Sequence, residues 1–256
     1  MRIFKLSVPL AVLILASCMA PLHAQSADRQ GFWARQIFQA TNQARARHGL
    51  PPLAWSPSLA RAANAHLSLM LSQPDLSHDY PGEPPLPARA AHAGAHFETI
   101  AENIAMGYSV PAIQKEWMHS PAHRANILDP RLNAAGVAVA SRHGNFYAVV
   151  DFAAAVQHRD ASQAVQQITQ LLRQTGIAPG GSRAAAQAAC APGYRLRAGT
   201  PVRLLVHFTT PDLSRLPPQV ISEIQSSGAT HAAVALCPSN GSQPDFTTYR
   251  VALLLY

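Results

Sequence analysis

The stretch Ala101–Leu128 constrains the fold of this chain more than any other, because it gathers polar residues and helix-breaking prolines within 28 residues. It reads AENIAMGYSVPAIQKEWMHSPAHRANIL in a chain of which only 13% of the residues are charged. The apolar run after Glu102 and Asn103 ends at Gly107, a pattern that predicts a short buried strand with a carboxylate at one end. A buried carboxylate without a partner is costly, so Glu102 is expected to have one.

Two serine-proline combinations predict two consecutive helices after this strand. Ser109 is a favourable cap ahead of Pro111, and Ser120 is a favourable cap ahead of Pro121 at the first position of the second helix. The second helix should stop at Asp129, which precedes another proline. We expect the Ser120 hydroxyl to satisfy free backbone N–H groups of this helix rather than to act as a nucleophile.

A carboxylate and an imidazole flank the break between these helices. Glu116 ends the first helix and His123 begins the second, so the two can meet near the turn. The positive end of a helix dipole disfavours a protonated ring, which leaves His123 in the neutral form that binds metals. The turn therefore suggests a site, and a simple capped helix junction is the alternative.

Residues 1–24 have the composition of an export signal. The segment begins with two basic residues, continues with an apolar run, and ends in Leu-His-Ala before a potential cleavage point. Its LASC sequence also fits a lipobox that ends at Cys18, where bacterial lipoproteins are cleaved and lipidated. Both routes predict an exported chain that is periplasmic, extracellular or lipid-anchored to the envelope.

The charge pattern argues against nucleic-acid binding. The basic residues are 18 Arg and two Lys, scattered singly, whereas a nucleic-acid footprint clusters on one face or helix. Loss of residues 1–24 would remove two positive charges and lower the formal net charge from +7 to +5, which suits a protein near an anionic envelope surface. No later stretch reaches the roughly 18 apolar residues of a spanning helix, so no transmembrane helix is expected in the mature chain.

Cys190 and Cys237 are the cysteines that remain outside the leader. In an oxidising compartment they are expected to form a disulfide, which closes a loop worth about 4 kcal/mol in the chain-entropy model. Neither cysteine has metal ligands nearby in the sequence.

Two amphipathic helices are expected upstream of the central stretch. The first covers residues 28–48, and the second begins at Ser56 and carries apolar residues at helical spacing to Leu71. His66 lies beside the buried face of the second helix and is interpreted as a partly buried helix residue rather than a ligand.

Residues 73–99 show no sustained periodicity and contain five prolines and two glycines. A loop of this length within a domain is usually functional or mobile. It carries His78, which is the better ligand candidate, and His92 and His96, which are interpreted as solvated loop residues.

The C-terminal half alternates strands and helices in an α+β pattern. Strands are expected over 135–140 and 145–154, joined by a tight hairpin at Gly144–Asn145, and a helix over 162–175. Later strands and one helix form a small unit that the disulfide holds together. The predicted organisation is a leader at 1–24, a first domain at 29–158, a helix with an Ala/Gly-rich linker at 159–190, and a small α+β unit at 191–256.

Short motifs between about residues 29 and 155 resemble the bacterial branch of the CAP superfamily, also called SCP-like, cysteine-rich secretory or pathogenesis-related-1 domains. Each motif alone is weak, but together and in this order they are specific. They are Asn42, Arg45, Leu53-Ala54-Trp55, Leu59, Ala62, Ser77-His78, Arg89, Gly94, Glu102-Asn103-Ile104-Ala105, Trp117, Ser120–Leu128, Gly136-Val137 and Tyr147–Phe152.

The resemblance implies an α-β-α sandwich with a cleft over its sheet. In eukaryotic members this cleft holds two His and two Glu, and in some it binds a divalent metal. Here His78 and Glu102 match the first pair, but Ser120 stands where the second Glu is expected and Phe146 where the second His is expected. Bacterial members carry instead the His of the SPxHR turn, here His123.

The predicted site follows from these positions. His78 and His123 are the candidate ligands of a divalent cation such as zinc, and Glu116 lies one residue before the family tryptophan. The candidate catalytic residues are His78, Glu102, Glu116 and His123, and the candidate ligand-binding cleft comprises His78, Glu102, Asn103, Trp117, His123 and Arg124.

Three functions fit these residues. We favour an envelope binding module in which the polar cluster shapes a cleft for a lipid, glycan or peptide. The second is a metal-assisted or general-base hydrolase, in which two imidazoles and a carboxylate activate water. The third is a structural protein, in which the same groups form a buried hydrogen-bonded network that rigidifies the core.

Overall fold

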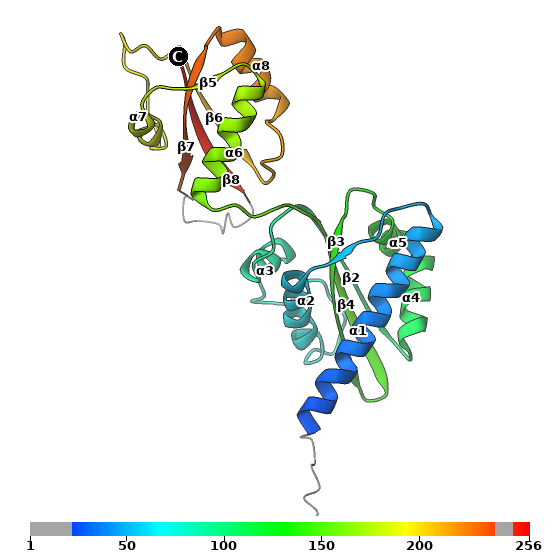
Figure 1. The fold of residues 1–256 in the computed structure, drawn as a ribbon. Coiled ribbons are helices and arrows are strands. Elements are labelled where there is room, and N and C mark those ends of the chain that lie inside the picture. The colour runs from blue at the N-terminus through cyan, green and yellow to red at the C-terminus, as the bar shows by residue number, and fades with distance from the viewer. Residues whose placement is uncertain (1–21, 239–247) are drawn as a thin grey trace, which may run out of the picture.

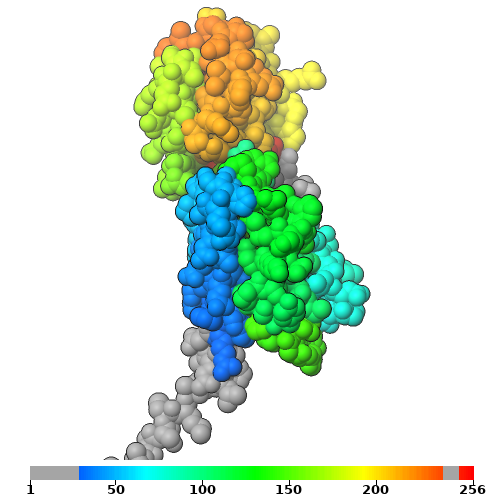
Figure 2. Space-filling model, turned by 90° about the vertical axis from the view of Figure 1, so that its right-hand side faces the viewer, coloured from blue at the N-terminus to red at the C-terminus, as the bar shows by residue number. Residues whose placement is uncertain are grey.

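A computed structural model describes residues 22–238 and 248–256, with side chains from residue 29 onward. The apolar leader and Cys18 lie outside the described residues. Two four-stranded sheets, each covered by helices, organise the described chain into an N-terminal and a C-terminal unit (Figure 1). In the space-filling view the two units form successive lobes, the first coloured blue to green and the second mostly yellow-green to orange (Figure 2).

The first sheet has the strand order β1-β3-β4-β2. The short strand β1 (Ala54–Trp55) pairs in parallel with the start of β3 (Ala134–Arg142). Strand β4 (Asn145–Ala155) lies in the middle and pairs antiparallel with β3 and with β2 (Phe97–Gly107). Both long strands next to β4 therefore have an outer edge, and β1 covers only the first residues of the β3 edge.

Helices cover both faces of this sheet. On one face lie α1 (Leu22–Arg47), α4 (Val110–His119) and α5 (Pro121–Ile127), whose apolar residues share a core with alternate residues of β3 and β4. On the other face lie α2 (Pro57–Met70) and α3 (Leu86–His92). The predicted α-β-α sandwich is confirmed.

The alternation of side chains along β3 explains why both faces are covered. Val137 and Val139 point into the core beneath α1, and Ala138 and Ala140 point into the core beneath α2. Because successive strand residues face opposite sides, a strand that is apolar throughout must be covered on both faces.

The β3–β4 turn follows the geometry of a tight hairpin. Arg142 pairs with Asn145, which leaves a two-residue loop of His143 and Gly144. Both residues have positive φ, 51° and 81°, as a type I′ turn requires. The hairpin was predicted, but its centre lies one residue earlier than expected.

The segment 73–99 is more ordered than its sequence predicted. It contains helix α3 and the first residues of β2. His92 lies exposed in the last turn of α3, and His96 stacks on His158 with 4.0 Å between ring centroids, so His96 is not simply solvated. Short helices with prolines in their first turn, such as α3, are easily read as loop from sequence.

The second sheet has the order β5-β7-β8-β6. Strand β5 (Ala178–Pro179) pairs in parallel with β7 (His231–Cys237). Strand β8 (Tyr249–Leu255) pairs antiparallel with β7 and with β6 (Leu204–Thr210).

Three helices pack on this second sheet. On one face α6 (Ala161–Gln174) and α8 (Pro218–Ser227) share a core with the strands, and α7 (Arg183–Ala188) packs on the other face. Residues 177–190 were predicted to form a linker. This prediction is wrong, because the segment contains β5 and α7. The Ala-rich sequence that suggested a flexible linker supplies instead the small buried face of a helix.

Cys190 and Cys237 form a disulfide, as predicted, and it lies within the C-terminal unit. It connects the end of the α7 segment to the last residue of β7. Among the described helices, none combines the length and the apolar character needed to cross a membrane.

The approach of α2 to β3 depends on Gly136. A Cβ atom added there would lie 2.0 Å from the backbone nitrogen of Ala60. We predict that Gly136→Ala lowers the free energy of unfolding by about 3 kcal/mol, because helix and strand must separate to admit the methyl group. Urea unfolding measures the change.

Gly31→Ala provides the control, since its added Cβ would meet nothing closer than 3.5 Å, on α1. That substitution should leave stability unchanged or raise it by up to about 1 kcal/mol, since alanine is the better helix former. Equal stability of the Gly136→Ala variant and the native protein would contradict the close approach.

Candidate functional site

The predicted pair of His78 and Glu102 meets in the structure. The Nδ1 atom of His78 lies 2.8 Å from Oε1 of Glu102, and the other carboxylate oxygen is bonded by the guanidinium of Arg89. The Glu102 side chain is 2% exposed, whereas the His78 side chain is 53% exposed. The carboxylate is thus enclosed, and the imidazole reaches from it to the surface.

The charges around these two residues shift their pKa values in opposite directions. The hydrogen bond with Glu102 raises the pKa of His78 above its ordinary value, against the effect of partial burial. Burial alone would raise the pKa of Glu102, but the His78 hydrogen bond and the charge of Arg89 outweigh it and lower the pKa. Glu102 is therefore a stable anion held by two cationic or protonated neighbours.

A second carboxylate, Glu83, extends this cluster towards α2. Its oxygen Oε1 lies 2.8 Å from Nδ1 of His66 and 3.4 Å from Nη1 of Arg89. Nε2 of His66 lies 3.0 Å from the carbonyl oxygen of Ser77, so both ring nitrogens face acceptors. His66 is completely buried rather than partly buried, because the segment after α2 folds back over it.

Asp151 on β4, which pairs with Glu102 of β2 in the sheet register, is the next member of the cluster. Its side chain is fully buried, and neither oxygen accepts a bond from an amide, hydroxyl or cationic group of the described residues. Burial first, and then the charge of neighbouring Glu102, raise its pKa well above the ordinary value. An ionised Asp151 would be a second buried anion beside Glu102 with no donor to bind it, so we assign Asp151 the protonated form.

His123 lies near His78 at the other side of the cluster. Partial burial, and to a lesser extent the charge of His78, lower its pKa, which favours the neutral ring. Its Nδ1 atom lies 3.0 Å from Oγ of Ser120. Ser120 occupies the predicted N-cap position of α5, but its hydroxyl makes no capping bond. The capping role predicted for this side chain is therefore wrong, because the imidazole one turn later competes for the hydroxyl.

The other predicted cleft residues have different positions. The buried amide of Asn103 bonds the carbonyl of His123, and the buried indole of Trp117 donates to the carbonyl of Ile104, so both tie helices to β2. Arg124 is exposed and approaches His48 at 3.3 Å, across from α1. Glu116 has an exposed side chain on α4.

The residues at the cluster do not fit a resident metal ion. Catalytic zinc sites use three protein ligands and structural sites use four. Within the described ranges, no group of three or more His, Cys, Asp or Glu side chains is arranged to hold a metal. His78 and His123 offer two imidazoles, and both oxygens of Glu102 are already bonded by His78 and Arg89.

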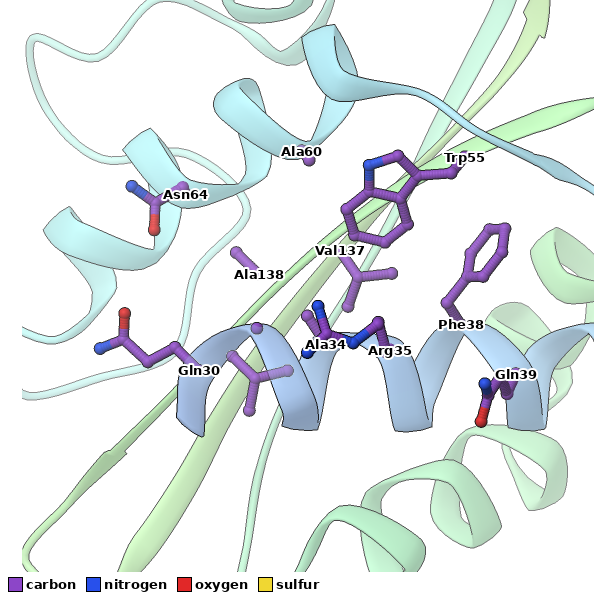
Figure 3. Close-up of a pocket in the computed structure, with 12 residues that line it drawn as sticks. Gln30, Ala34, Arg35, Phe38, Gln39, Trp55, Ala60, Asn64, Val137 and Ala138 are labelled. Atoms are coloured by element: carbon purple, nitrogen blue, oxygen red, sulfur yellow. The ribbon is translucent and has the colours of Figure 1, made fainter. Parts of the chain in front are cut away.

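A groove of about 630 Å³ opens at the opposite edge of the sheet, between α1 and α2 (Figure 3). Its walls are mostly apolar, with Ala34 and Phe38 from α1, Trp55 from β1, and Ala60 from α2. Figure 3 shows Trp55 and Phe38 side by side at one end, where their rings meet edge to face at 5.2 Å. The floor of the groove is strand β3, at residues 137–139.

Sequence reasoning did not assign His66, Glu83, Arg89 or Asp151 to the site, and it missed the whole groove. His66 was placed on the correct helix, but the fold-back that buries it depends on Glu83, which lies in a segment without periodicity. Asp151 was visible as the charged residue on an otherwise apolar strand, a signal that predicts a buried polar partner. The groove has no motif, because it results from the distance between two helices.

The N-terminal part of the chain is similar to known proteins. Residues 38–152 match the model of the cysteine-rich secretory protein family, CAP. The chain is 32% identical to the uncharacterized protein YkwD of Bacillus subtilis over 104 residues, which are 40% of each protein. It is also 32% identical to the uncharacterized membrane protein YlbC of the same organism over 106 residues, 41% of this chain and 31% of the relative. The chain thus spans less than half the length of either relative.

Solved structures also resemble part of the chain. An extracellular protein containing an SCP domain from Bacillus anthracis is 34% identical, with a TM-score of 0.47 over 52% of this chain and 44% of that chain. An outer surface protein from Borrelia burgdorferi is 17% identical, with a TM-score of 0.43 over 47% of this chain and 91% of that chain.

The protonated state of Asp151 predicts how stability changes with pH. The native state keeps a proton that the unfolded chain releases above about pH 4, so the free energy of unfolding should fall as pH rises from there towards the raised native pKa. Asp151→Asn keeps the shape and removes the titration. We predict that its stability falls less between about pH 4 and about pH 8, and that at neutral pH it is at least as stable as the native protein.

Glu102→Gln is the matched comparison. It leaves the buried Arg89 without its main partner and should lower stability by about 3 kcal/mol at neutral pH. Urea unfolding at a series of pH values measures both variants. A loss for Asp151→Asn as large as that for Glu102→Gln would show that Asp151 is an essential anion.

Proposed function

The chain belongs to the CAP superfamily through its domain at residues 38–152, and from this premise we propose that the domain is a ligand-binding module exported to the cell envelope. The ligand occupies the groove between α1 and α2. The His-Glu cluster at the other edge of the sheet holds the domain in shape.

The groove is the single observation that carries this proposal. Its volume of about 630 Å³ falls within the range of ligand sites, which are mostly apolar with a few polar groups that orient the ligand. The polar groups here are Gln30, Arg35 and Gln39 on α1 and Asn64 on α2. The side chains of all four are exposed and thus available to a ligand.

The internal hydrogen bonds of the cluster support a role in stabilising the fold of the domain. Each oxygen of Glu102 and both ring nitrogens of His66 already face partners inside the protein. A general base must have a free acceptor that reaches the substrate. A satisfied buried network instead rigidifies the fold around it.

Export is part of the proposal and is supported by two features of the chain. The leader at residues 1–24 has the order of basic, apolar and small residues that export signals share. The disulfide between Cys190 and Cys237 is a bond that persists in oxidising compartments.

A hydrolase is the second candidate, and one contact favours it. Oγ of Ser120 lies 3.0 Å from Nδ1 of His123, which is within the range of a nucleophile and its base, and the lowered pKa of His123 favours the neutral ring that can accept a proton. His78 and Glu102 lie beside this pair. If Ser120 is a nucleophile, the protein should react with a fluorophosphonate probe and Ser120→Ala should lose that reaction, whereas Ser109→Ala should retain it.

We predict that the full-length protein binds at least one of three probes: a fluorescent long-chain fatty acid, a muropeptide, or a fluorescent extended hexapeptide. Asn64→Trp fills the groove from its exposed position on α2 and should weaken that binding at least tenfold. Fluorescence anisotropy, or calorimetry for the muropeptide, measures the affinity.

Two controls separate the groove from the cluster. Gln43→Trp adds the same bulk at an exposed position of α1 that does not line the groove, and it should bind as the native protein does. His78→Ala should also retain binding. The proposal fails if none of the probes binds, or if His78→Ala abolishes binding while Asn64→Trp does not.

A further inference from the structure

The outer edge of β3 has unpaired backbone groups where it forms the floor of the groove. Successive residues of a strand direct their N–H and C=O groups to opposite edges. The carbonyl of Ala135 faces β1, since it accepts a bond from the backbone N–H of Ser56. The backbone groups of Val137 and Val139 therefore face the same outer edge. In the part of the chain that the structure describes, the backbone groups of Val137 and Val139 on this edge have no hydrogen-bond partner.

This edge is open because β1 is very short. Strand β1 pairs only with Ala134 and Ala135, and the chain then turns at Ser56 into α2. Gly136 allows α2 to touch β3 at Ala60, and beyond this contact the helix and the strand edge line the groove together. Two donors and two acceptors of the strand are thus left between two helices.

Side chains cover part of the opposite edge of the same sheet. The carbonyl of Glu102 on β2 accepts a bond from Asn126, and that of Ile104 accepts one from Trp117. Natural proteins generally cover or block the edges of their sheets, because an open edge pairs with other chains. The β3 edge, in contrast, forms the floor of a groove, and we regard it as the place for an incoming strand.

An extended peptide is the occupant that fits this edge. It presents N–H and C=O groups at the spacing of a strand and can pair with Val137 and Val139, as in other cases of strand addition. A lipid chain would leave the same groups unpaired, which is costly in a groove with apolar walls. A folded sheet cannot enter, because α1 and α2 flank the edge on both sides.

The charge of the groove indicates which peptides bind. Arg35 lines the groove, and none of the lining residues is acidic. Among the described residues, Arg35 has no carboxylate partner. Figure 3 shows the side chain of Arg35 on α1, between those of Ala34 and Phe38. A peptide carboxylate, either terminal or from an acidic side chain, complements this guanidinium.

We propose that the groove binds an extended peptide bearing a carboxylate, which adds as a strand to the open edge of β3 at Val137 and Val139. This rests on the proposed binding function and names its ligand class. Alternate side chains of the peptide face the apolar wall at Phe38 and Trp55, and Arg35 binds the carboxylate.

The test uses the full-length protein and a fluorescein-labelled hexapeptide of alternating Val and Thr with a free C-terminal carboxylate. Two further forms carry N-methyl groups either on every Val or on every Thr. In a strand added to an edge, only one of these two sets of N–H groups points at the protein. We expect one methylated form to bind at least tenfold more weakly and the other to bind nearly as well as the parent peptide.

Charge reversal tests the carboxylate contact. Arg35→Glu should weaken binding of the free-acid peptide about tenfold and leave binding of its C-terminal amide unchanged, since a contact to a charged group contributes about 1.5 kcal/mol. Arg47→Glu, also exposed on α1 but outside the groove, should bind both peptides as the native protein does. In ¹⁵N spectra the peptide should shift the amide signals of Val137 and Val139.

The outcomes separate this inference from the proposed function. Equal binding of both methylated forms and the parent peptide, or unshifted Val137 and Val139 amides, would overturn strand addition. If the hexapeptide fails to bind while the fatty acid binds in the groove, the peptide inference is wrong and the binding module stands. If no probe binds, both proposals are wrong.

Discussion

The ion pair between Arg89 and Glu102 is the interaction on which the N-terminal domain depends most. Both side chains are nearly inaccessible, at 3% and 2% exposed, and a buried charge without its partner costs several kcal/mol, roughly 3 to 5. Arg89 belongs to α3 and Glu102 to β2, so the pair fixes the irregular segment after α2 onto the sheet. The positions of His78, Glu83 and His66 all follow from it, because each bonds one member of the pair or its neighbour.

The two outer edges of the first sheet differ in what covers them. The cluster that holds the domain in shape lies at one edge, and the groove proposed to bind the ligand lies at the other. Side chains of α4 and α5 bond two carbonyls of the β2 edge, and the polar cluster lies on that side. The β3 edge lies between α1 and α2 with free backbone groups and apolar walls. A ligand in the groove therefore has no need to contact the cluster, in which Glu102 is bonded by His78 and Arg89 and His66 is bonded by Glu83.

Much of this architecture could be predicted from local sequence. Ser109 and Pro111 begin α4 as expected, Ser56 begins α2, and the hairpin after β3 requires positive φ where His143 and Gly144 lie. That Glu102 has a partner could be anticipated from the cost of a buried carboxylate, and the family resemblance implied that this partner is His78. The hydrogen bond of the Ser120 hydroxyl could not be predicted, because whether this hydroxyl caps α5 or bonds His123 depends on the orientation of a ring one turn away. Residues 177–190 show the same limit, since an Ala-rich segment becomes a helix only when a sheet is present to pack against.

Helix α2 connects the cluster and the groove, and this connection determines how the groove can behave. Its residues Ala60 and Asn64 line the groove, and His66 on the same helix is held in the cluster by Glu83. Moving α2 away from β3 would strain the bonds of His66, and moving it closer is prevented by the contact at Gly136. The groove is thus fixed in width before a ligand arrives, and a preformed site loses less free energy to ordering when it binds. The buried charges, though distant from the ligand, contribute to binding by keeping this distance constant.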